Sequence, residues 1–290
     1  MAFNNPISNM WLADPEAREY NGEYWIYVTN SDSYENQKNL SVIHSKDLNE
    51  FEVIPDIIDM PGYPHANRAI WAPSVVEKDG RYYIIFACND IQSDDEIGGL
   101  EMGASDSPQG PFKSYCPTVV DKFVNGAQPI DAHFFKDDDG TIYLLYGGWG
   151  HCNIAVMNDT MDGFVPFENG EIFKEITPEG YTEGPCMFKR NGKYYFMWSS
   201  GNWTNGTYCV NYGIADKPYS EFDIKGLVLA SEYPIAKGPG HNGFLHLKSE
   251  NKWLVVYHRH FCDDDRGNAR FICIDEMNFD GENILPIKMT

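Results

Sequence analysis

The segment Asp79-Gly80-Arg81-Tyr82-Tyr83-Ile84-Ile85 joins a tight turn to a run of aromatic and aliphatic residues. Asp-Gly and Asn-Gly are favoured hairpin turns, because both central positions require a positive φ. The same unit recurs at residues 21–27, 139–145 and 191–197, and a degenerate copy lies at residues 250–256. The intervals are 58, 60, 52 and 59 residues when they are counted from Gly22, Gly80, Gly140, Gly192 and Asn251.

A second pattern recurs in register with these turns. An aspartate lies 19 to 26 residues after each turn, and a phenylalanine follows it within six residues. The aspartate can close a turn and the phenylalanine can fill space between sheets. The pairs are Asp47/Phe51, Asp106/Phe112, Asp159/Phe164, Asp216/Phe222 and Asp275/Phe279.

Five repeats of short strands predict an all-β fold. A period of this length indicates a five-bladed β-propeller, with about four antiparallel strands per blade around a central channel. An irregular β-sandwich would leave the matched spacing of two patterns as coincidence. We therefore expect one catalytic propeller domain over residues 1–290 and no additional domain.

The composition excludes several functional classes. The net charge of −21 disfavours contact with nucleic acid or an anionic membrane surface. No apolar run approaches the roughly 20 residues of a membrane helix. The N-terminus lacks the features of a secretory signal, so we expect a cytoplasmic protein, or a secreted one that has been trimmed. We expect no organic cofactor, and the sequence leaves the oligomeric state open.

Eight to ten residues before each turn lies the residue expected to open the innermost strand of a blade. Because equivalent positions surround one axis, these five side chains should face a common channel. Three of them are carboxylic acids, and acids at close range raise one another's pKa, as in acid–base sites. In chain order the five residues are Asp14, Ala72, Asp131, Glu183 and His241.

Each of these residues also has a structural interpretation. Asp14 could cap a turn with Pro15, Asp131 could close a hairpin, and Glu183 could be a solvated strand end. His241, between glycines, could simply pack. The occurrence of three acids at matched positions nevertheless favours a shared site.

A general acid and a general base facing each other across a channel suit hydrolysis of a glycosidic bond. In the inverting mechanism the two carboxyl groups stand roughly 6.5–9.5 Å apart, which leaves room for water. Aromatic residues suit the apolar face of a sugar ring, so Trp71 and Trp203 are candidate substrate-binding residues. Either tryptophan could instead belong to the core.

The chain resembles glycoside hydrolase family 43 over essentially its full length. The resemblance rests on five short motifs in order, which are Ala13-Asp14-Pro15, Trp71-Ala72-Pro73, Ile130-Asp131-Ala132, Glu183-Gly184-Pro185 and Gly240-His241-Asn242. It implies a five-bladed propeller and inverting hydrolysis. The motifs of the related fructan-cleaving families and of the sialidases are absent or incomplete.

The resemblance also implies a role for each matched residue. Asp14 matches the general base, Glu183 the general acid, and Asp131 the residue that orients the acid and tunes its pKa. His241 matches a histidine that helps to hold a calcium or sodium ion, largely through water. Arg270 resembles an arginine that contacts a sugar hydroxyl.

The expected substrate is a pentose-containing oligosaccharide or polysaccharide. We expect an exo-acting α-L-arabinofuranosidase on arabinoxylan or arabino-oligosaccharides, since a site without an additional β-sandwich admits a branched chain. A β-xylosidase is the first alternative and an endo-arabinanase the second. A non-catalytic sugar-binding propeller would not need three acids, because buried carboxylates are costly without a role.

Overall fold

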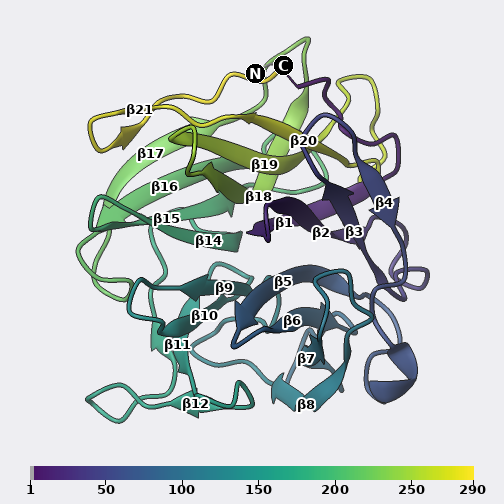
Figure 1. Ribbon diagram of the computed structural model, residues 1–290, viewed down its shortest axis with the longest axis vertical. Coiled ribbons are helices and arrows are strands. Elements are labelled where there is room, and N and C mark those ends of the chain that lie inside the picture. Colours follow the sequence, from purple (N-terminus) through teal and green to yellow (C-terminus); the bar gives the residue numbers. More distant parts are fainter. Residues whose placement is uncertain (1–2) are drawn as a thin grey trace.

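The computed structural model describes residues 3–290. Within this range the only helical element is a short 3₁₀ turn, η1 (Met60–Gly62), and the remaining regular structure is β-strand. The strands form antiparallel sheets that are arranged around one central axis (Figure 1). The predicted all-β, five-bladed propeller is therefore confirmed.

Each blade begins with a strand on the axis and continues outward in chain order. Blade 3 also carries the short strand β13, and the hairpin β21–β22 follows blade 5. The strands are β1 (Leu12–Tyr20), β2 (Glu23–Asn30), β3 (Leu40–Ser45) and β4 (Glu52–Ile54) in blade 1; β5 (Trp71–Lys78), β6 (Arg81–Cys88), β7 (Gly99–Ser105) and β8 (Lys113–Val120) in blade 2; β9 (His133–Lys136), β10 (Ile142–Tyr146), β11 (Asn153–Met157), β12 (Phe164–Val165) and β13 (Lys174–Glu175) in blade 3; β14 (Glu183–Arg190), β15 (Lys193–Ser200), β16 (Cys209–Ala215) and β17 (Asp223–Leu229) in blade 4; β18 (Lys237–Leu247), β19 (Lys252–His260) and β20 (Phe271–Glu276) in blade 5; and β21 (Phe279–Asp280) with β22 (Asn283–Ile284).

The predicted turns join the first two strands of the blades. Both central residues have positive φ in blades 1, 2 and 4, as the Asn-Gly and Asp-Gly pairs require. Blade 3 differs, because only Gly140 has positive φ and its N–H donates to the Asp137 carbonyl at 3.0 Å. The predicted turn at Asp275 is wrong. Asp275 is buried in β20, where its carboxylate accepts a hydrogen bond from the Tyr257 hydroxyl.

The N-terminal segment closes the ring. The Ile7 N–H donates to the Ile272 carbonyl at 2.9 Å, and the Asn5 side chain bonds to both backbone groups of Ile274. Residues from the start of the chain thus extend the last blade. A separate hydrophobic cluster lies between every pair of neighbouring blades. This packing holds the five inner strands around the axis. No helix in the described range is long and apolar enough to span a membrane.

Candidate active site

One residue near the start of each inner strand has left-handed backbone geometry. Residues other than glycine rarely adopt a positive φ, and those that do concentrate at functional sites. The shared geometry identifies the equivalent position in the five blades. The residues are Asp14 (φ 53°), Ala72 (46°), Asp131 (54°), Gly184 (64°) and His241 (44°).

This geometry corrects one prediction from the sequence. The blade 4 equivalent of Asp14 is Gly184, not Glu183, which lies one residue earlier and matches Trp71 in strand register. A Cβ atom at residue 184 would lie 3.1 Å from the Ser199 hydroxyl oxygen and 3.3 Å from the His241 ring, so glycine suits the position. Glu183 nevertheless lines the same cavity as Asp14 and Asp131. The count was wrong by one residue because it allowed eight to ten residues before the turn, whereas Gly184 lies eight residues before Gly192, as Asp14 lies eight before Gly22.

The inner strands open into a cavity of about 190 Å³ at one end of the axis. It is smaller than the roughly 300–1,000 Å³ of pockets that hold drug-sized ligands, so it suits a single sugar ring. Every site residue that the sequence predicted lines this cavity. The other lining residues, which sequence reasoning missed, are Tyr34, Gln37, Asp90, Gln92, Gln128, Ile130 and Trp149.

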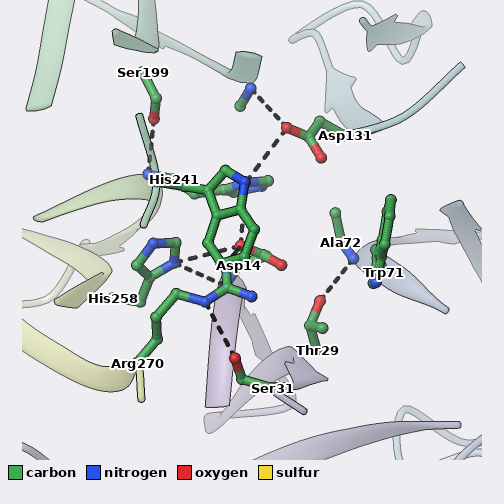
Figure 2. Close-up of polar contacts among 12 residues, drawn as sticks. Asp14, Thr29, Ser31, Trp71, Ala72, Asp131, Ser199, His241, His258 and Arg270 are labelled. Carbon is green, nitrogen blue, oxygen red and sulfur yellow. Dashed lines mark hydrogen bonds and ion pairs between the residues drawn. The ribbon is translucent and has the colours of Figure 1, made fainter. Parts of the chain in front are cut away.

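Asp14 is held as a carboxylate. Burial alone would raise its pKa, but neighbouring groups, with the Arg270 charge foremost, outweigh burial and hold the pKa of Asp14 well below the usual range. The Arg270 guanidinium donates to Asp14 Oδ1 at 3.0 Å. The Nδ1 atoms of His241 and His258 each lie 3.4 Å from the same oxygen (Figure 2). Asp14 is therefore ready to accept a proton.

Glu183 has the opposite character. Burial raises the pKa of Glu183 to about 7. A hydrogen bond of 2.8 Å from the Tyr208 hydroxyl to Oε1 opposes the rise, and the charge of Asp14 adds to it. Glu183 therefore retains its proton under mildly acidic conditions and can donate it.

Asp131 lines the same cavity as these two acids. Its Oδ2 accepts a hydrogen bond from the Gly184 N–H at 3.0 Å and lies 3.6 Å from His241 Nδ1 (Figure 2). Burial raises the pKa of Asp131 well above its usual range, and the charges of Glu183 and Asp14 add to this. The hydrogen bond from the Gly184 N–H favours the ionised form of Asp131 and opposes this rise.

Two further residues hold the acids, and sequence reasoning missed both. His258 is fully buried, and its Nδ1 accepts a hydrogen bond from the Asp14 N–H at 3.1 Å. Burial lowers the pKa of His258 to about 3, so its ring stays neutral. Tyr208, the donor to Glu183, stacks on this ring at 5.7 Å. Neither residue belongs to a motif, and only the fold brings them to the site.

The predicted substrate-binding residues form the cavity wall. The guanidinium carbon of Arg270 lies 4.6 Å from the centre of the Trp203 ring. Arg270 therefore bridges Asp14 and an aromatic surface. On another part of the wall, Trp71 donates its indole N–H to Gln37 and packs edge-on against Tyr34. Both tryptophans are thus available to a bound sugar.

His241 lies beside two carboxylates, which is where the resemblance implied an ion. The His241 N–H donates to the Ser199 hydroxyl at 2.8 Å, and its Nδ1 faces the carboxylates of Asp14 and Asp131. Over residues 3–290, no group of three or more His, Cys, Asp or Glu side chains has the geometry to hold a metal ion. The described side chains around His241 therefore do not form a coordination sphere for a metal ion by themselves.

The arrangement combines an ionised carboxyl group, a second one that retains its proton and a third carboxyl group in a cavity sized for a sugar. A pair of carboxyl groups, one protonated and one ionised, is typical of the active site of a glycoside hydrolase. The chain belongs to glycosyl hydrolases family 43, whose family model matches residues 3–284.

Individual relatives share this length and fold. The chain is 36% identical to the β-D-galactofuranosidase xynD of Aspergillus niger, over 99% of this chain and 85% of the relative. It is 26% identical to a β-xylosidase of Xylanibacter ruminicola, over 94% of this chain and 95% of the relative. A solved α-L-arabinofuranosidase of Clostridium thermocellum has a TM-score of 0.76 and 27% identity, over 98% and 95%. A thermostable family-43 glycoside hydrolase has a TM-score of 0.83 and 23% identity, over 100% and 96%.

Proposed function

We propose that the protein is an inverting exo-glycosidase that removes terminal α-L-arabinofuranosyl residues from arabinoxylan or arabino-oligosaccharides. The observation that carries this proposal is the opposite protonation of Asp14 and Glu183 in one small cavity. A cavity for one ring favours release of terminal residues over cleavage within a chain.

In the proposed reaction, Asp14 takes a proton from a water molecule that attacks the anomeric carbon. The bond from this carbon to the leaving oxygen breaks, and Glu183 gives its proton to that oxygen. The sugar is released with inverted configuration, Asp14 ends protonated and Glu183 ionised, and solvent exchange restores both. Asp131 orients Glu183, and Arg270 holds Asp14 and a sugar hydroxyl.

A β-D-galactofuranosidase is the second candidate, favoured by the 36% identity to the Aspergillus niger enzyme. The rings of β-D-galactofuranose and α-L-arabinofuranose have the same configuration and differ in the substituent at C4. The same three acids could therefore act on either sugar. A β-xylosidase, followed by an endo-arabinanase, remains the alternative among pentose-releasing activities.

The experiment compares 4-nitrophenyl α-L-arabinofuranoside, β-D-galactofuranoside and β-D-xyloside with linear arabinan. We expect the highest kcat/KM on the arabinofuranoside, with release of monosaccharide. Proton NMR at early times should show the product in the inverted configuration. Retained configuration would reject the mechanism, and the fastest turnover on the galactofuranoside or xyloside would reassign the substrate.

We further propose that a calcium or sodium ion lies near His241, held mainly through water, since side chains alone do not form a coordination sphere there. When bound, the ion would supply positive charge below the sugar. Adding calcium after chelation should raise the melting temperature of the wild type but not of His241→Ala. Equal responses of the two proteins would place any ion elsewhere.

A further inference from the structure

A second polar layer lies directly below the three acids. Glu16 is two residues beyond Asp14 on β1, and His133 is two residues beyond Asp131 at the start of β9. Glu16 and His133 belong to blades that are not neighbours, yet their side chains lie 3.1 Å apart, so both point into the central channel. Only 5% of Glu16 and 2% of His133 is exposed.

The His133 ring bonds to two other inner strands. Its Nδ1 lies 3.1 Å from Glu16 Oε2 on β1. Its Nε2 lies 3.1 Å from both the N–H nitrogen and the carbonyl oxygen of Met187, on the strand that begins at Glu183. One imidazole thus links the backbone segments that carry Asp14, Asp131 and Glu183. All three strands border the axis in Figure 1.

The link spans the channel, which the hydrophobic clusters do not. Each cluster joins two neighbouring blades, whereas Glu16 and His133 belong to blades 1 and 3. Arg18 forms an ion pair with Glu16 and donates to the Phe134 carbonyl at 2.7 Å, so it braces the same pair of blades.

We infer that His133, anchored by Glu16, is a positioning residue that sets the separation of the catalytic acid and base across the channel. The inference rests on the roles proposed above for Asp14 and Glu183. An inverting enzyme must keep its two carboxyl groups roughly 6.5–9.5 Å apart to admit one water molecule. A misplacement of about 1 Å can cost on the order of 10²-fold in rate.

With the proton on Nδ1, His133 donates to Glu16 and its Nε2 accepts from the Met187 N–H, so one ring connects the three strands.

The test compares His133→Phe and His133→Gln with the wild type on the best aryl glycoside, at a temperature where each is fully folded. Leu144→Ala is the control, because Leu144 is a buried residue of the same blade that makes no polar contact. We expect His133→Phe to lower kcat about 10- to 100-fold with KM changed less than threefold. His133→Gln, which keeps a polar group facing Glu16, should recover part of kcat, and the control should keep it.

A second readout does not require turnover. Carbon-13 NMR titration of the Glu183 carboxyl should give a lower pKa in His133→Phe than in wild type, because a loosened site admits water. An unchanged kcat with an unchanged Glu183 pKa in folded His133→Phe would overturn the inference, as would an equal loss of kcat in Leu144→Ala. A wild type that hydrolyses no glycoside would refute the proposed function, and the titration would still decide the role of His133.

Discussion

Arg270 and Asp14 lie 256 residues apart in the sequence and are joined by a buried hydrogen bond of 3.0 Å between Nη1 and Oδ1. The pair connects the first inner strand to the segment before β20. Because the arginine stays charged, it keeps the base ionised in an otherwise desolvating site. The contact that joins the first and last blades of the propeller therefore also keeps the Asp14 carboxyl group ionised.

Replacing Arg270 with Gln should raise the pKa of Asp14. The base works only when it is ionised, so the acidic limb of kcat/KM should move to higher pH by one unit or more. Arg270→Lys, which keeps the charge, is the control and should move the limb less. An acidic limb unchanged in Arg270→Gln would show that Arg270 acts only on the substrate.

Replacing Glu183 with Gln should remove proton donation without a large change of shape. We expect turnover of natural oligosaccharides to fall about 10²- to 10⁴-fold. A substrate with a good leaving group, such as an aryl glycoside, needs little protonation and should lose less. Steady-state kinetics on both substrates provide the measurement, and equal losses would contradict the assignment of Glu183 as the acid.

Asp131→Asn should move the alkaline limb to lower pH. The acid works while it is protonated, and in wild type kcat/KM should fall as pH rises through about 7. The carboxylates of Asp131 and Glu183 repel each other when both are ionised, so removing the charge of Asp131 should lower the pKa of Glu183. A rate that falls with no shift of the limb would restrict Asp131 to orientation, and no change in either would assign it to the turn.

Tyr208→Phe should have the opposite effect on the same limb. The hydroxyl of Tyr208 stabilises the ionised form of Glu183, so its loss raises the pKa of the acid and moves the limb to higher pH. The two variants thus test one carboxyl group from both directions. If the limb moves the same way in both, general loosening of the site is responsible, rather than the two named contacts.

Part of the site could be found from local sequence. The motifs around Asp14, Asp131 and Glu183 gave the three acids, and all three line the cavity. The register of Glu183 was miscounted because the spacing to the turn varies from eight to ten residues between blades, and only the backbone geometry identifies Gly184 as the equivalent of Asp14. Tyr208 and His258 gave no signal, since an isolated tyrosine or histidine in a strand-rich chain is typical of a core.

The sequence by itself determined the repeated architecture, because hairpin turns and alternating strands depend on residues only a few positions apart. The five copies of the turn around Gly80 were enough to predict the propeller. Only the tertiary structure decided which acid holds a proton. A pKa depends on burial and on charges through space, and the groups that act on Asp14 and Glu183 come from distant parts of the chain. Their convergence on the axis, rather than any motif, gives the carboxyl groups the different protonation on which the proposed roles of base and acid rest.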